Sequence, residues 1–163
     1  MALALASSLA LGGGFMDVTN MRRLALLSAL GALLAGPAQG ADPAAEAATA
    51  YVLDTASSTR TVGVGESGKL VLVIRPKVPT WHVHPQAPLK IRFEVPPGLK
   101  IEKAELARRD ALDPKAEEPR FETAFVAAAA GSQEAKAIVD FFICSDAACV
   151  KQTRTVAIPV SVK

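Results

Sequence analysis

The division of the chain into short apolar or alternating segments, separated by turn residues, constrains the fold more than any other feature. In residues 89–95 apolar and charged side chains alternate, and Pro96-Pro97-Gly98 follows directly. Strict alternation is typical of a half-buried strand, and Pro and Gly are typical of the turn that ends it. No segment has a helical period over ten residues or more. The pattern therefore predicts a β protein.

Six further segments have the length and composition of strands. They are residues 60–64, 69–74, 99–106, 121–128, 135–144 and 153–162. The alternation in 99–106 slips after Ile101, which a β-bulge would explain. Residues 110–119 are charged and contain two prolines, so we expect a loop there. About seven short strands without helical crossovers predict an all-β fold, an immunoglobulin-like antiparallel β-sandwich.

The first forty residues are predicted to be a signal peptide. Met21-Arg22-Arg23 is a short cationic start, thirteen apolar or small residues follow, and small residues at positions 38 and 40 suit cleavage after Gly40. A membrane anchor is the alternative, but thirteen helical residues rise only about 20 Å, whereas a bilayer core is about 30 Å thick. We expect an over-extended translational start, a flexible lead-in over residues 41–59 and one domain over 60–163. The predicted location is periplasmic or secreted, without a membrane span after cleavage.

Composition excludes several classes of function. Without residues 1–40 the chain loses two of its 18 basic and one of its 16 acidic residues, and its net charge is +1. No basic block remains, so nucleic acid is not an expected partner. The sequence has no glycine-rich phosphate loop, no G-x-S-x-G elbow and no H-E-x-x-H motif. No cofactor is therefore expected.

The two cysteines are the first candidate site. Cys144 and Cys149 are separated by four residues, between two predicted strands, which suits a hairpin loop and a disulfide. Export to an oxidising compartment favours that bond. It has two interpretations, a structural staple or an exchangeable redox pair. A staple of so short a loop contributes only about 2 kcal/mol, which a domain with a good core does not require.

Two charged residues near the cysteines bear on that choice. Asp146 would disfavour a thiolate by charge repulsion, or accept a proton during exchange, but a turn aspartate that bonds the loop backbone is the simpler interpretation. Lys151 would stabilise a thiolate, unless it is an ordinary solvated side chain.

The segment Trp81-His82-Val83-His84 is the second candidate site. In a strand, His82 and His84 face the same side, about 6–7 Å apart. Two imidazoles at this spacing could bind a metal ion with further ligands from elsewhere, but neither pair has the spacing of a metal motif. The simpler expectation puts Trp81 and Val83 in the core and both histidines on the opposite face, with no metal.

The order of these motifs resembles a known family. Trp-His-Val-His, a strand closed by Pro-Pro-Gly-Leu, a charged loop and a late Phe-Phe-Ile-Cys-Ser-Asp-Ala-Ala-Cys are similar to the amino-terminal periplasmic domain of DsbD-type thiol–disulfide interchange proteins. The resemblance covers approximately residues 61–162. It implies an immunoglobulin-like domain in which Cys144 and Cys149 are the catalytic redox pair of an electron carrier.

Three functional hypotheses follow. The first is a periplasmic thiol–disulfide carrier, whose partners would be periplasmic thiol or disulfide proteins and a separate membrane reductase. The second is a non-catalytic β-sandwich for binding or assembly, with a structural hairpin disulfide. The third is a metal-handling protein that uses His82 and His84. Whether the protein is an enzyme therefore depends on the state of the two cysteines.

Overall fold

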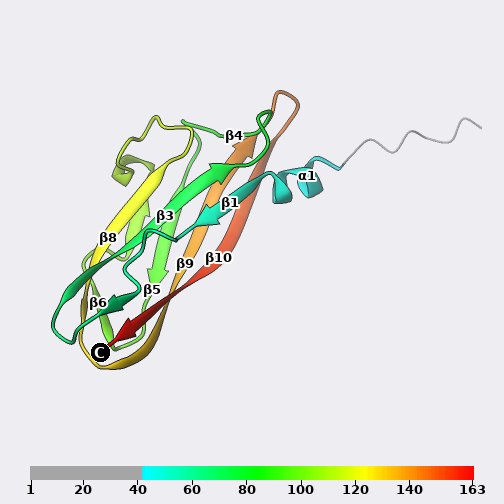
Figure 1. The fold of residues 1–163 in the computed structure, drawn as a ribbon. Coiled ribbons are helices and arrows are strands. Elements are labelled where there is room, and N and C mark those ends of the chain that lie inside the picture. Colours follow the sequence, from blue (N-terminus) through cyan, green and yellow to red (C-terminus); the bar gives the residue numbers. More distant parts are fainter. Residues whose placement is uncertain (1–41) are drawn as a thin grey trace, which may run out of the picture. The chain divides into compact units, whose positions relative to one another are not determined.

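Two β-sheets form a sandwich in the computed structural model, which describes residues 42–163 (Figure 1). The elements are α1 (Pro43–Thr49), β1 (Tyr51–Asp54), β2 (Thr61–Val62), β3 (Ser67–Pro76), β4 (His82–Val83), β5 (Lys90–Glu94), β6 (Leu99–Ile101), β7 (Glu105–Ala107), a 3-10 turn η1 (Arg108–Asp110), β8 (Arg120–Ala127), β9 (Gly131–Cys144) and β10 (Cys149–Val162). The first sheet has the order β1-β3-β8-β6. The second has the order β2-β10-β9-β5-β7, and β4 also pairs with β9.

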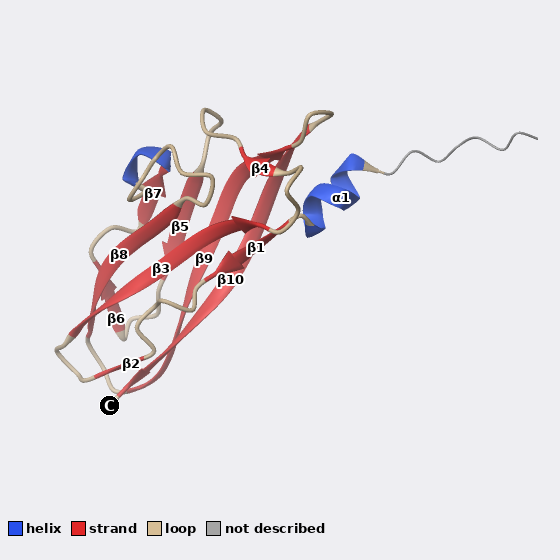
Figure 2. Ribbon diagram, turned by 45° about the horizontal axis from the view of Figure 1, so that its top comes forward, coloured by secondary structure: helices blue, strands red, loops and turns tan. Residues whose placement is uncertain are grey.

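The predicted all-β fold is confirmed, and strands dominate the described chain (Figure 2). All strand pairs are antiparallel except β2 with β10, which run parallel. The structure has more strands than the seven expected. β1 and β4 are four and two residues long, too short for an alternating pattern to show in the sequence. The third difference comes from the segment 99–106.

The expected bulged strand over residues 99–106 is wrong, because this segment forms two strands in different sheets. β6 pairs with β8 in the first sheet, and β7 pairs with β5 in the second. The alternation slips after Ile101 because the chain crosses between the sheets over residues 102–104. The crossing segment is bonded to β8, because the Thr123 hydroxyl donates to the Lys103 carbonyl at 2.9 Å.

The segment 41–59 differs from the expected flexible lead-in where the structure describes it. Asp42 caps α1 by accepting from the Ala44 amide at 2.9 Å, and Pro43 occupies the first turn, where its missing N–H costs nothing. Ala47 is fully buried, and β1 pairs with β3. The predicted signal peptide and its cleavage after Gly40 lie outside the described residues. Within residues 42–163, no helix is long and apolar enough to cross a membrane.

The core lies between the sheets and is built from alternate residues of the long strands. Leu70, Leu72 and Ile74 of β3 face inward and are fully buried. From the opposite sheet, Phe141 of β9 packs edge-on against Tyr51, with ring centroids 4.8 Å apart. Edge-to-face contacts of this kind contribute beyond the apolar area that they bury.

On the side of the sandwich that β1, β2 and β10 form, polar contacts join the two sheets. The Tyr51 hydroxyl donates to Gln152 Oε1 at 3.1 Å, and both residues are buried. The Arg154 guanidinium lies 6.0 Å from the Tyr51 ring centroid. Further along the same edge, Ser161 pairs with Thr61 in the parallel ladder. Burial and the Arg154 charge act in opposite directions on Tyr51, and burial dominates, so the pKa of Tyr51 is raised.

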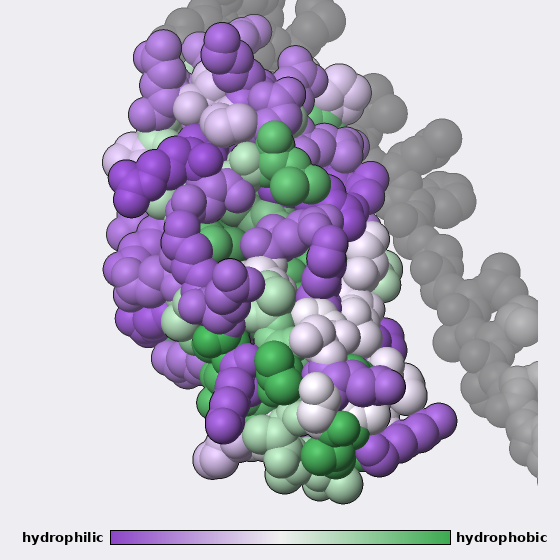
Figure 3. All heavy atoms as spheres, turned by 90° about the vertical axis from the view of Figure 1, so that its left-hand side faces the viewer, coloured by the Kyte–Doolittle hydropathy of each residue, from purple (hydrophilic) through white to green (hydrophobic). Residues whose placement is uncertain are grey.

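The surface is mixed rather than apolar. The face in Figure 3 is mostly hydrophilic in its upper part, and hydrophobic residues gather towards its lower part. Within residues 42–163, the exposed large hydrophobic side chains are Val52, Val64, Val78, Leu112 and Val126. Single exposed apolar residues of this kind are normal in folded proteins.

A charged cluster on the outer face of the first sheet leads to a prediction about pH. Glu122 accepts from Arg120 at 2.9 Å and from Lys69 at 3.2 Å, and these bonds hold the pKa of Glu122 below its usual value, the Arg120 bond most strongly. A carboxylate with a lowered folded-state pKa stabilises the fold above its unfolded-state pKa, and this contribution is lost as the pH falls.

We therefore expect the stability of the wild type to fall more steeply between pH 5 and pH 2 than that of Glu122→Gln, which has no carboxylate to protonate. Urea unfolding at a series of pH values measures both slopes. Equal slopes would show that these ion pairs contribute nothing, as is common for exposed pairs.

Candidate functional site

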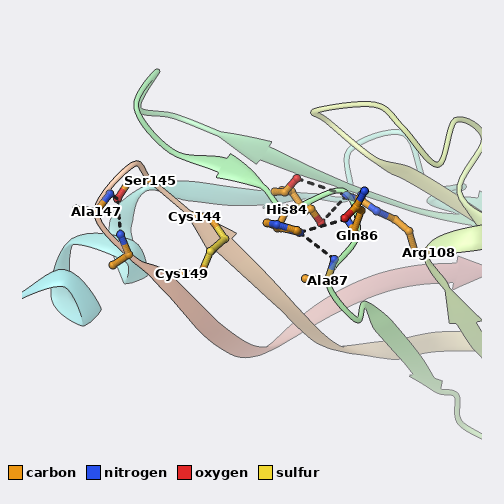
Figure 4. Close-up of a disulfide and its surroundings, with 10 residues drawn as sticks. His84, Gln86, Ala87, Arg108, Cys144, Ser145, Ala147 and Cys149 are labelled. Atoms are coloured by element: carbon orange, nitrogen blue, oxygen red, sulfur yellow. Dashed lines mark hydrogen bonds between the residues drawn. A yellow bond between two sulfur atoms is a disulfide. The ribbon is translucent and has the colours of Figure 1, made fainter.

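The cysteines lie at the tip of the longest hairpin. Cys144 of β9 and Cys149 of β10 are directly opposite, their Cα atoms are 4.0 Å apart, and they form a disulfide (Figure 4). The Ser145 amide donates to the Ala148 carbonyl at 2.8 Å and closes the turn. The predicted hairpin disulfide is confirmed.

The disulfide faces the outer side of the second sheet. Along β9 the odd-numbered residues from Ala135 to Ile143 are buried in the core, whereas Cys144 has the opposite parity. Cys144 is nevertheless only 2% exposed, because β9 has a neighbouring strand on each side at this point. His82 of β4 pairs with it on one side and Cys149 on the other, so the three residues form a row across three strands. Cys149 and His82 are exposed.

Of the two charged residues near the cysteines, Lys151 is exposed, as its simpler interpretation expected, whereas Asp146 does not have the expected backbone bond. Ser145, not Asp146, bonds the turn backbone: its hydroxyl oxygen accepts from the amides of Ala147 and Ala148, both at 3.3 Å. The ammonium of Lys151 lies 4.0 Å from Asp140 Oδ1, further along the sheet. No hydrogen bond or ion pair within residues 42–163 directs either charge to the disulfide.

The histidine segment has the expected faces. Trp81 and Val83 are buried, His82 is exposed and His84 is half-buried. His84 Nδ1 accepts from the amides of Gln86 and Ala87, at 3.2 and 3.0 Å, so this nitrogen is already used (Figure 4). Among residues 42–163, no three His, Cys, Asp or Glu side chains are grouped closely enough to hold a metal ion.

Trp81 connects the histidine segment to α1. This contact was not anticipated from the sequence. The indole Nε1 of Trp81 donates to Glu46 Oε1 of α1 at 3.0 Å. Beside it lies a cavity of about 340 Å³, lined by Pro76, Lys77, Val78, Pro79, Trp81, His82, Glu117 and Glu118. The bond explains why α1 packs here, since a buried indole N–H requires an acceptor.

A group of cationic residues was also not identified from the sequence as a candidate site. Arg108, Arg109 and Lys115 line a second cavity, next to the turn that follows His84. The sequence signal was the pair Arg108-Arg109 directly before the charged loop, but a short basic pair is common on protein surfaces.

Comparisons with known proteins give neither a family nor a curated relative. No family model matches the chain, and no curated protein matches it. A conjugative transposon lipoprotein from Bacteroides eggerthii is similar in structure, with 10% identity over 69% of this chain and 97% of that chain, and a TM-score of 0.40. A conjugate transposon protein from Bacteroides vulgatus has 13% identity over 68% and 83%, with a TM-score of 0.38. AggA, the major subunit of aggregative adherence fimbriae type I from Escherichia coli, has 11% identity over 69% and 94%, with a TM-score of 0.33.

The resemblance to the amino-terminal domain of DsbD-type proteins is therefore wrong. Neither a family model nor a curated protein supports it. Of the motifs whose order suggested it, the Cys-Ser-Asp-Ala-Ala-Cys segment also suits a disulfide across a β-hairpin turn in an unrelated protein.

Proposed function

We propose that the chain is an extracytoplasmic, non-catalytic β-sandwich for binding or assembly, in which Cys144–Cys149 is a structural staple. The single observation that carries this proposal is the burial of Cys144 between two paired strands, at 2% exposure. A visiting thiolate must reach a sulfur atom to exchange it, and strands flank this cysteine on both sides, so only the exposed Cys149 offers a sulfur to attack. The disulfide itself supports an oxidising compartment.

The position of the bond also suits a structural role. β9 and β10 pair over fourteen residues each, and the disulfide fixes the end of this ladder, where strand ends otherwise fray. The core side chains of both strands lie on the other face, and they begin at Ile143 and Val150, directly beside the two cysteines. The staple therefore secures the tip from the outer face of the sheet.

We expect Cys144→Ser/Cys149→Ser to keep the fold and to lose about 2 kcal/mol of unfolding free energy, the value for closing so short a loop. Urea unfolding of the oxidised wild type and the double variant measures the difference. Wild type reduced with dithiothreitol is the matched control and should unfold with the variant. Loss of a cooperative transition in the variant would contradict this limited role.

A redox titration tests the proposal directly. A structural bond has a potential below about −300 mV, whereas an exchangeable one lies near −200 mV. We expect the lower value, and no mixed disulfide when the Cys144→Ser variant is exposed to periplasmic extract. A potential near −200 mV together with a captured protein would overturn the structural assignment.

Thiol–disulfide exchange at Cys144 and Cys149 is the second candidate function. The observation that favours it is the row described above: Cys149 is exposed, and His82 lies beside Cys144 in the ladder. An imidazolium stabilises a nearby thiolate. If the pair exchanges, His82→Ala should make the reduction potential of the disulfide more negative. His84→Ala is the control and should leave this potential unchanged, because the Nδ1 of His84 bonds the backbone instead.

A further inference from the structure

A cavity of about 650 Å³ lies between the turn after β4 and the loop after η1. It is lined by Pro85, Gln86, Arg108, Arg109, Pro114 and Lys115. Three of the six residues are cationic and none is acidic. The volume is within the range of small-molecule sites, about 300–1,000 Å³.

None of the three cations of this cavity forms an ion pair within residues 42–163, although the pKa of the neighbouring Asp110 carboxylate is lowered, most by its bond to Lys103 and also by the nearby charge of Arg109. The ion pairs found within residues 42–163 use other cations, such as Lys103 with Asp110 at 2.7 Å and Arg75 with Glu118 at 3.3 Å. Two acidic residues of the same loop, Glu117 and Glu118, line the other cavity, beside Trp81, whereas Asp113 accepts from the Lys115 amide.

Arg108 is the most constrained of the three cations. Its Nη2 donates to the carbonyls of His84 at 2.9 Å and Val83 at 3.4 Å, and its Nε donates to that of Pro85 at 3.3 Å. Its Nη1 is buried and has no hydrogen-bond partner, unlike every other buried side-chain nitrogen or oxygen within residues 42–163. Burial lowers the pKa of Arg108, and no acidic group acts against this. A partly desolvated guanidinium held only by neutral oxygens favours an anion beside it.

The walls of the cavity are held in place without a ligand. Arg108 and His84 Nδ1 fix the turn that carries Pro85 and Gln86. On the other side, Asp113 Oδ1 accepts from the Lys115 amide at 2.8 Å. Two prolines restrict the backbone further. A ligand would therefore bind without ordering either loop, which lowers the cost of binding.

We propose that this cavity binds a small organic acid. Its carboxylate lies among Arg108, Arg109 and Lys115, and its apolar body packs against Pro85 and Pro114. The carboxylate satisfies the unpaired charges, and the prolines provide the apolar surface that an inorganic anion would not use. This inference goes beyond the proposed function and does not depend on the state of the disulfide.

Titration of the oxidised protein with three probes tests the proposal. Benzoate has a carboxylate and an apolar ring, benzamide has the same shape without the charge, and inorganic phosphate has charge without an apolar body. In ¹H–¹⁵N spectra we expect benzoate to shift the amide signals of Gln86, Arg109 and Lys115, with at least tenfold weaker binding of the other two probes. Equal binding of benzamide would overturn the role of charge, and equal binding of phosphate would overturn the role of the apolar body. No shift with benzoate would overturn the site.

Matched variants locate the binding. Arg109→Ala/Lys115→Ala should weaken benzoate binding at least tenfold, while Lys100→Ala/Lys136→Ala removes the same charge from exposed positions outside the cavity and should leave it unchanged. Arg108 is left in place because it holds the turn. Equal weakening in both double variants would show a non-specific charge effect and reject the site. The redox potential is measured independently, so a failure here leaves the staple untouched.

Discussion

Replacing Phe141 by alanine should lower the free energy of unfolding by about 3–5 kcal/mol, the range for truncating a fully buried phenylalanine. Phe141 has no exposed surface and packs edge-on against Tyr51 at 4.8 Å. Its removal leaves a cavity between the sheets at the edge where Tyr51 also bonds Gln152. Urea unfolding measures the loss.

Phe142→Ala is the matched control for this substitution. Phe142 is the next residue of β9, has the opposite parity and is only half-buried. The same atoms are removed from the outer face, so the loss should be about 1 kcal/mol. Equal losses at both positions would mean that the inward and outward faces of β9 have been assigned incorrectly.

Gly68→Ala is expected to destabilise the protein by about 1–3 kcal/mol through overpacking. A Cβ at this position would lie 2.5 Å from Cζ of Phe125, whose ring is itself buried at 1% exposure. The backbone of β3 or the ring must therefore shift. Thermal or urea unfolding provides the measurement.

Gly98→Ala separates this effect from the general cost of removing a glycine. A Cβ there would clash with the side-chain nitrogen of Gln133, but that atom is the flexible end of a long side chain and can turn away. Neither glycine has a positive φ. We expect a change of less than about 1 kcal/mol, and a loss as large as that of Gly68→Ala would contradict the overpacking argument.

The sheet architecture was predictable because alternation is a local signal. Ile91 and Phe93 face the core as their spacing indicates, and the long apolar segment around Leu72 is a central strand. The assignment of strands to sheets was not predictable in the same way. The passage from β6 to β7 depends on which partner each strand finds, and the sequence around Glu102 shows only a break in the pattern. α1 was missed because its seven residues are too few for a helical period, and its packing depends on Glu46 reaching Trp81.

The candidate site was predictable only in part. The Cys144–Cys149 bond follows from spacing, because opposite positions near a turn are within reach of a disulfide. The burial of Cys144 does not, because it depends on pairing with β4, which lies about 60 residues earlier in the chain. The basic cavity is equally non-local, since Arg108 meets Pro85 only in the folded protein. Such contacts leave no periodic trace in a single sequence.

The polar bond between Tyr51 and Gln152 has a consequence for the rate of folding. It joins residues 101 positions apart, and the parallel pair β2–β10 also joins the first part of the domain to its last strand. Bringing such distant segments together costs loop entropy before any contact repays it. We expect the local β9–β10 hairpin to form first and the closure of the sandwich on this side to limit the rate. We therefore expect refolding in milliseconds to seconds, as for other β-sandwiches.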